Sequence, residues 1–277
     1  MPDPNFIVIG APKAGTTSLC NYLAGHEQVY LYENKETQFF SGKYDRGFAW
    51  YQSLFNGARD NQVIGEGTPG YALGPNTGQV AKRIHDHLPK VKLIYMVRDP
   101  IERIKSHYAQ GLANGFPDIG LSKAVFERQN LIEASRYQAR LNDYLAFFPR
   151  EQIHIIMFDD LIADQKKTIS ACLKFLGLPP AEQVELAKRG ARETRARDGV
   201  SLSLLKRTKP FEVLRPLIPN RIVEKVRPYF KEKINLDKID LSLSDAAFEH
   251  IKKELQEETV QFLKNMGRPK NLWTFTN

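Results

Sequence analysis

A lysine and two threonines lie in a short glycine-rich stretch close to the start of the sequence. The stretch FIVIGAPKAGTTSL spans residues 6–19, and its two glycines have the G-x-x-x-x-G spacing of a phosphate-binding loop. In a P-loop nucleotidase a lysine would follow the second glycine. Here Thr16 and Thr17 follow it, and Lys13 lies inside the loop. The pattern predicts a phosphate site that was not built for a nucleoside triphosphate.

The loop is expected to bind phosphate because it joins an apolar strand to a helix. A helix beginning at Thr16 points free backbone N–H groups and the positive end of its dipole toward the loop. The hydroxyls of Thr16 and Thr17 fall in its first turn and can donate to phosphate oxygens. A nucleotide with a short 5′ phosphate group, and with no obligatory metal, fits such a loop.

A second anion signal follows a later apolar strand. Arg98 ends the stretch VKLIYMVR, Pro100 can begin a helix, and Ser106 lies one and a half turns into that helix. Arg98 can hold a phosphate by a forked hydrogen bond with Ser106 beside it, and Arg103 is a further candidate. The two motifs together predict a nucleotide that is phosphorylated at two separate places.

These motifs resemble those of the PAPS-dependent sulfotransferases, where PAPS is 3′-phosphoadenosine 5′-phosphosulfate. PKAGTTSL (12–19) is similar to their 5′-phosphosulfate loop, and VRDPIERIKSHY (97–108) to their 3′-phosphate motif. NKETQFF (34–40) resembles the Lys-Glu-x-x-Phe-Phe segment of the heparan-sulfate-type branch. GEGTPGY (65–71) resembles that branch's Glu-Lys-Thr-Pro-x-Tyr segment, although Gly67 stands where the branch has lysine. The resemblance covers roughly residues 5–180, and LKNMGRPKNLW (263–273) is similar to the helix-then-Trp ending of many bacterial members.

The resemblance implies roles for particular residues. Lys13 would stabilise charge on the leaving 5′-phosphate oxygen, and Glu36 would accept the proton of the acceptor hydroxyl. Glu66 is the rival base, and Glu36 could instead be only an ion-pair partner of Lys35. The implied nucleotide-binding residues are Lys13, Ala14, Gly15, Thr16, Thr17, Ser18, Arg98 and Ser106, together with Arg192, Arg195 or Arg197 from the basic stretch 189–199.

The resemblance therefore predicts a nucleotide-binding transferase. It would move a sulfuryl group from PAPS to an acceptor hydroxyl on a small molecule, lipid or carbohydrate, release adenosine 3′,5′-bisphosphate, and need no metal. One alternative is a P-loop nucleoside or nucleotide kinase, which lacks its lysine here. Another is a non-catalytic binder of adenosine 3′,5′-bisphosphate. The sequence identifies neither the acceptor nor the oligomeric state.

The elements that must position these residues alternate along the chain. Continuous apolar runs predict buried strands at 6–10, 62–67, 91–97 and 153–158. Helical patterns lie at 16–24, 78–88, 101–114, 137–148 and 161–176. This alternation predicts an α/β fold, a three-layer sandwich with a central parallel sheet of the P-loop nucleotide-binding type and a helical C-terminal elaboration. In such sheets, ligands bind beyond the carboxyl ends of the strands.

The chain is expected to form a single domain over residues 1–277. It would have a core at about 5–180, a basic flap or lid at about 190–240, and a docked C-terminal helix at about 243–266, capped by Ser242 or Ser244. Lys and Arg are interleaved with apolar residues in 202–230, so peripheral contact with a membrane or an anionic polymer is the alternative to a flap.

The bulk composition narrows the classes of partner and compartment. The formal net charge is +8 over 277 residues, which favours anionic partners. No nucleic-acid-binding module is recognisable, so nucleic acid is not expected as a partner. The sequence shows no apolar run of membrane-spanning length and no signal-peptide pattern. Its two cysteines lack metal-type spacing and suit free thiols, which predicts a cytoplasmic protein.

Overall fold

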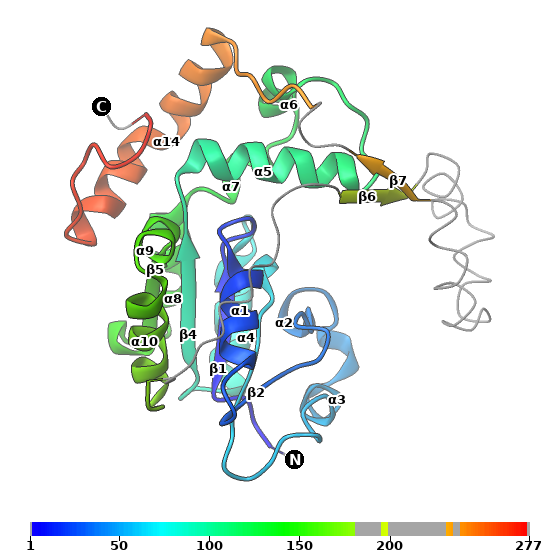
Figure 1. The fold of residues 1–277 in the computed structure, drawn as a ribbon, viewed down its shortest axis with the longest axis vertical. Coiled ribbons are helices and arrows are strands. Elements are labelled where there is room, and N and C mark those ends of the chain that lie inside the picture. The colour runs from blue at the N-terminus through cyan, green and yellow to red at the C-terminus, as the bar shows by residue number, and fades with distance from the viewer. Residues whose placement is uncertain (1, 181–194, 199–230, 235–238, 276–277) are drawn as a thin grey trace.

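A five-stranded parallel sheet forms the centre of the computed structural model, which describes residues 2–180, 195–198, 231–234 and 239–275 (Figure 1). Its strands are β1 (Phe6–Gly10), β2 (Val29–Leu31), β3 (Val63–Glu66), β4 (Lys92–Val97) and β5 (Ile153–Met157). They lie in the order β2-β3-β1-β4-β5, and each neighbouring pair is parallel. The predicted α/β sandwich with a central parallel sheet is confirmed.

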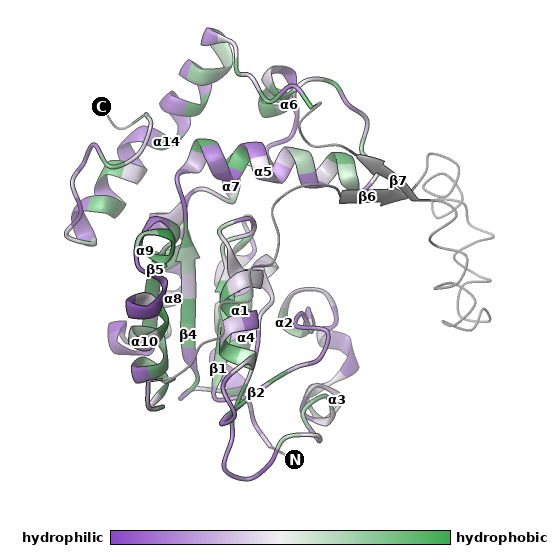
Figure 2. Ribbon diagram, viewed as in Figure 1, coloured by the Kyte–Doolittle hydropathy of each residue, from purple (hydrophilic) through white to green (hydrophobic). Residues whose placement is uncertain are grey.

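Helices cover both faces of this sheet, which explains why its strands are largely apolar (Figure 2). Helices α1 (Thr16–Ala24) and α10 (Gln165–Leu176) lie on one face, and α4 (Thr77–His87) and α8 (Tyr137–Leu145) on the other. Helix α5 (Pro100–Ala113) follows β4 and crosses beyond the ends of the strands (Figure 1). None of the helices in the described part of the chain is both long enough and apolar enough to cross a bilayer.

Shorter elements connect these layers. They are α2 (Phe39–Gly42), α3 (Phe48–Ser53), α6 (Leu121–Glu127), α7 (Asn130–Glu133) and α9 (Phe158–Ala163), with the 3₁₀ helices η1 (Tyr44–Arg46), η2 (Pro69–Ala72) and η3 (Arg150–Gln152). The single helix predicted at 161–176 is in fact two, α9 and α10. Asp164 leaves the helical conformation between them, and its side chain accepts a hydrogen bond from Lys167 N. Strand β2 was not predicted, because three residues are too few to show a period.

The helical C-terminal segment is present as α14 (Asp245–Asn265). Its N-cap is Ser244, whose side chain accepts a hydrogen bond from the backbone of Ala247. The apolar face of α14 divides between two hydrophobic clusters. Ile251 and Leu255 pack in a cluster with residues of α5 and α6, whereas Phe262 joins the main core beside the sheet. The helix therefore links α5 to the core.

A two-stranded antiparallel ribbon lies apart from the central sheet. It consists of β6 (Arg195–Asp198) and β7 (Lys231–Ile234). Strand β6 is in contact with α5 (Figure 1). The predicted flap at about 190–240 falls mostly outside the described residues, and the segment 202–230 falls outside them entirely.

Candidate functional site

The loop between β1 and α1 depends on glycine at both glycine positions of the motif. A Cβ at Gly10 would lie 2.6 Å from the Cβ of Ala72, so the backbone approach leaves no room for a side chain. Gly15 has a φ of 95°, in the left-handed region, and a Cβ there would lie 2.7 Å from the ring of Phe158. The loop is thereby folded tightly against the ends of the sheet, as a phosphate cradle requires.

The N-terminus of α1 is open toward this loop. Within the part of the chain that the structure describes, no side chain caps it, and its first turn holds no acidic residue. By contrast, side chains of Asp99, Asp164 and Ser244 cap α5, α10 and α14. The backbone N–H groups at the start of α1 and its dipole therefore remain directed at the space that the loop surrounds.

Lys13 projects from this loop toward α5. Its backbone has a φ of 70°, and its Nζ donates a hydrogen bond to Oε1 of Gln110 at 3.2 Å. Gln110 lies on α5 one turn after Ser106, whose side chain is half-buried. The predicted loop residues and the predicted α5 residue therefore lie at one edge of the sheet, with Lys13 between them. Gln110 could not have been found from its sequence position alone.

Lys35 brings the segment that contains Glu36 to the same loop. Its Nζ lies 3.4 Å from Oγ1 of Thr16 and 3.4 Å from Oγ1 of Thr17. The same Nζ forms an ion pair with Oε1 of Glu36 at 3.1 Å. The side chain of Glu36 is 40% exposed, whereas that of Lys35 is 16% exposed. A carboxylate open to solvent thus lies beside the threonines of the loop.

A buried polar cluster holds the segment that follows Glu36. Both carboxylate oxygens of Glu66 accept hydrogen bonds from Thr37, one from its backbone N at 3.2 Å and one from its hydroxyl at 2.8 Å. Thr68, Tyr51 and Tyr71 also donate to this carboxylate. Glu66 is completely buried, and burial raises its pKa, although the hydrogen bonds from Thr68, Thr37 and Tyr71 oppose that shift. Glu66 therefore fixes the backbone on which Glu36 is carried.

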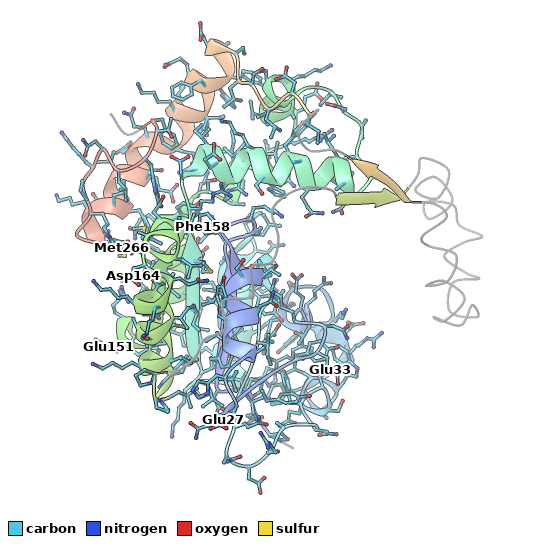
Figure 3. The ribbon with its side chains drawn as sticks, viewed as in Figure 1. Glu27, Glu33, Glu151, Phe158, Asp164 and Met266 are labelled. Atoms are coloured by element: carbon cyan, nitrogen blue, oxygen red, sulfur yellow. The ribbon has the colours of Figure 1, made fainter. Side chains whose placement is uncertain are left out.

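The second anion element begins where β4 ends. The guanidinium of Arg98 is 3.2 Å from Oε2 of Glu102 and lies 4.8 Å from the ring centre of Phe158. Phe158 directly follows β5 (Figure 3). Its ring is the one that a Cβ at Gly15 would meet. One aromatic side chain therefore contacts both predicted anion elements. Sequence reasoning missed Phe158, although its place directly after IHIIM puts it at the correct edge of the sheet.

Arg103 does not belong to the anion site, contrary to the sequence-based expectation. It is completely buried and donates hydrogen bonds to Oγ of Ser135 and to the backbone carbonyls of Leu131 and Pro12. Its Nη1 also lies 3.1 Å from Nδ1 of His107, which must accept because arginine can only donate. Burial, together with the charges of Arg103 and Lys13, lowers the pKa of His107 to about 3. Arg103 therefore ties α5 to the loop.

The late basic residues are only partly placed. Arg192 lies outside the described residues. Arg195 and Arg197 belong to β6, which lies beside α5, the helix that contains Ser106. Figure 1 shows β6 near the C-terminal end of α5, away from the end that follows β4, and the assignment of its arginines stays a prediction.

Comparisons with known proteins agree with this geometry. A model of the Sulfotransferase domain family matches residues 3–267. Heparan sulfate glucosamine 3-O-sulfotransferase 6 from Mus musculus is 32% identical over 184 residues, which cover 63% of this chain and 52% of that protein. Membrane-associated sulfotransferase kil1 from Dictyostelium discoideum is 43% identical over 108 residues, which cover 38% of this chain and 22% of that protein.

A solved structure shows a similar fold. The crystal structure of a sulfotransferase from Alicyclobacillus acidocaldarius superposes with a TM-score of 0.62 at 25% identity, covering 69% of this chain and 88% of that one. The chain spans about half the length of the heparan sulfate relatives that it matches. The match to the family model, at residues 3–267, includes the loop, Glu36 and Arg98.

Proposed function

The chain belongs to the sulfotransferase family, and we propose that it transfers a sulfuryl group from PAPS to a hydroxyl of an acceptor molecule. The observation that carries this proposal is the position of Glu36. Through Lys35, this exposed carboxylate is joined to the hydroxyls of Thr16 and Thr17 at an open helix N-terminus. A proton acceptor and an anion cradle at one edge of the sheet are what such a transfer needs.

The residues present fit a nucleotide with two separated anionic groups. The cradle leaves no room for a Cβ at Gly15, and the N–H groups of residues 15–17 with the Thr16 and Thr17 hydroxyls would hold the 5′-phosphate. Arg98 and Ser106 would hold the 3′-phosphate. PAPS, when bound, supplies the sulfuryl group as an anhydride with its 5′-phosphate.

Two side chains would perform the chemistry. Glu36 accepts the proton of the acceptor hydroxyl as that oxygen attacks the sulfur in line. Lys13 stabilises the negative charge that grows on the 5′-phosphate oxygen as its bond to sulfur breaks. The hydrogen bond to Gln110 directs the Lys13 ammonium across the loop, toward α5. This arrangement supports the two roles without requiring a metal ligand from the chain.

Glu36, and not Glu66, is the base that the geometry favours. Glu66 is completely buried, and its oxygens accept five hydrogen bonds from backbone and side chains. An acceptor hydroxyl therefore has no route to it. Glu36 is exposed, so its carboxylate can contact an acceptor. The next residue, Thr37, is held by hydrogen bonds to Glu66, so the backbone that carries Glu36 stays in place.

The alternatives fit less well. A P-loop kinase needs a lysine directly after the second glycine, and that position holds Thr16, which is 4% exposed. A non-catalytic bisphosphate binder would not need an exposed carboxylate beside the cradle. The acceptor is proposed only as a hydroxyl compound, whether small molecule, lipid or carbohydrate. A cytoplasmic location also stays a proposal, supported by the free, buried thiols of Cys20 and Cys172.

Calorimetry and a transfer assay test this function. The protein should bind adenosine 3′,5′-bisphosphate without added metal, and should consume labelled PAPS in a screen of hydroxyl-bearing metabolites and oligosaccharides. Binding of ATP with magnesium, and no binding of the bisphosphate, would instead establish the kinase alternative.

A variant of Glu36 tests its assignment as the base. Glu36→Gln removes the proton acceptor but keeps the side-chain shape, so turnover should fall about 100-fold or more. The matched control is Glu33→Gln, which alters an exposed carboxylate three residues earlier in the chain and should leave most of the turnover intact. Near-normal turnover in Glu36→Gln would reject Glu36 as the base.

A further inference from the structure

The ammonium group of Lys35 occupies the place where an anion in the cradle would meet the threonine hydroxyls. It lies 3.4 Å from each hydroxyl, beyond the usual range of about 2.7–3.2 Å for N–H···O hydrogen bonds. Its contact with Glu36 is shorter, at 3.1 Å. Lys35 is thus only weakly bound to the cradle and more firmly bound to the carboxylate.

The backbone of Lys35 is held in a conformation that aims its side chain at the loop. Its φ is 63°, which a residue other than glycine rarely adopts. The backbone N donates to Tyr32 O at 2.7 Å, and the carbonyl accepts from Gly67 N at 2.8 Å. Left-handed conformations of this kind persist where surrounding contacts impose them, and they cluster at functional sites.

Gly67 provides the surface over which the Lys35 side chain passes. A Cβ at Gly67 would lie 3.4 Å from Cε of Lys35, and 2.6 Å from Sγ of the buried Cys20. A side chain at position 67 would therefore collide with Cys20 and press on Lys35. The absence of a side chain at Gly67 leaves space for Lys35, which is why this lysine can reach the cradle.

On the premise of the proposed function, we propose that Lys35 binds the 5′-phosphosulfate group of the donor and gives up its ion pair with Glu36 to do so. Without donor, the ammonium is paired with the carboxylate. When the anion enters between the ammonium and the threonine hydroxyls, its charged oxygens form stronger hydrogen bonds than the hydroxyls do. The ammonium then moves its main contact from Glu36 to the anion, and the carboxylate is released to accept the acceptor's proton.

This exchange makes the base dependent on the donor. In the ion pair, Oε1 of Glu36 is in contact with the Lys35 ammonium at 3.1 Å and is not available to a hydroxyl. Donor binding frees this oxygen when a base is needed. Binding of the donor in the cradle thus makes the Glu36 carboxylate available as the base, through Lys35. Lys35 also contributes a second positive charge at the cradle, besides that of Lys13.

A thermodynamic cycle tests the exchange by calorimetry with adenosine 3′,5′-bisphosphate, whose 5′-phosphate would occupy the cradle. Lys35→Met should weaken binding about 10-fold, since a charge-assisted contact is lost. Glu36→Gln should tighten binding about 2- to 5-fold, because it removes the competing partner of Lys35. In the Lys35→Met background, Glu36→Gln should change the affinity by much less, and Lys35→Arg should retain most of it.

Controls separate this exchange from a general effect of charge. Lys82 and Asp86 form an exposed ion pair on α4, so Lys82→Met and Asp86→Asn make the same kinds of change away from the site and should not alter affinity. Melting temperatures of all variants report whether they fold. Unchanged affinity in a folded Lys35→Met variant would refute the inference. So would an equal tightening by Glu36→Gln in both backgrounds.

The inference and the proposed function fail in different ways. If the unmutated protein does not bind the bisphosphate, the proposed function fails and the role of Lys35 fails with it. If the unmutated protein binds the bisphosphate and transfers sulfuryl groups while Lys35→Met binds equally well, only the role of Lys35 is rejected.

Discussion

The starts of α1 and α5 are two solutions to the same structural problem, a helix that follows a parallel strand at the binding edge of a sheet. Helix α1 begins after Gly15 with no side-chain cap, so its N–H groups are available to a ligand. Helix α5 begins after Asp99, whose side chain accepts from Glu102 N at 3.0 Å and from both the N and Oγ1 of Thr274.

This difference shows which part of each motif can bind an anion. At α1 the proposed cradle consists of the backbone itself, and side chains would add to it. At α5 the N-terminus is already occupied by a carboxylate, so only side chains such as Arg98 and Ser106 are left to bind a phosphate. Backbone geometry should therefore matter most at the first site, and individual side chains at the second.

The largest expected effect concerns the lysine of the first site. Lys13→Ala should lower turnover about 100-fold or more, because a donor aimed at developing charge contributes about 3–4 kcal/mol to the transition state. Bisphosphate affinity should fall much less, since the backbone cradle remains. Steady-state kinetics and calorimetry measure the two quantities. Lys105→Ala on α5 is the control, and near-normal turnover in Lys13→Ala would show that the cradle alone suffices.

At the second site, Arg98→Ala should weaken bisphosphate binding about 10- to 100-fold, the range for a lost charged hydrogen bond. Adenosine 5′-phosphosulfate, which lacks the 3′-phosphate, should bind both proteins about equally. Competition binding with the two ligands measures the difference. An equal loss for both ligands would mean that Arg98 acts through Phe158 on the first site, and would remove the proposed separation of the two sites.

Two glycine-to-alanine variants test whether the backbone of the first site binds the phosphate. Gly15→Ala should reduce bisphosphate affinity about 10-fold and also lower stability, since the new methyl meets Phe158 and overpacking costs about 1–3 kcal/mol. Gly47 also has a positive φ, 79°, but a Cβ there would meet nothing within 4 Å. Gly47→Ala should therefore lose stability alone, and equal affinities in the two variants would contradict a backbone cradle.

The smallest expected effect is on stability, and it comes from comparing two helix caps, Asp164 at the start of α10 and Asp99 at the start of α5. Asp164→Ala removes a simple helix cap, and about 1 kcal/mol of stability should be lost. Asp99→Ala should lose about 2 kcal/mol, because its hydrogen bonds to Thr274 are lost as well. Denaturant unfolding of both variants provides the comparison. If Asp99→Ala instead strengthened bisphosphate binding, the start of α5 would be a latent backbone site like that of α1.

The sequence pattern predicted those parts of the structure that depend on residues close together in the chain. Long apolar runs marked β1, β3, β4 and β5, and the loop spacing placed Lys13, Thr16 and Thr17 at a helix start. The segment β2 was too short for such a signal. Asp164 divided a helix that periodicity alone made continuous, because its capping side chain outweighed the apolar pattern on either side.

The missing parts of the site arise from contacts between distant segments. Lys35 acts across nearly twenty residues on the threonines of the loop, and Gln110 reaches Lys13 from another helix. Arg103 resembled a phosphate ligand because its spacing in the motif suited one. Whether an arginine one turn into a helix faces solvent or the core is decided by what packs over it, here Ser135 and Leu131.

The ring of Phe158 touches both Gly15 and Arg98, so it acts as a spacer between the two binding elements. The size of this ring and the sheet below it would fix the distance between the two proposed anion sites. Nucleotides would then be sorted by the distance that separates their charged ends, before any feature of the base is read. An isomer with its second phosphate on the neighbouring ribose hydroxyl would carry the same charge and still fail to span the gap.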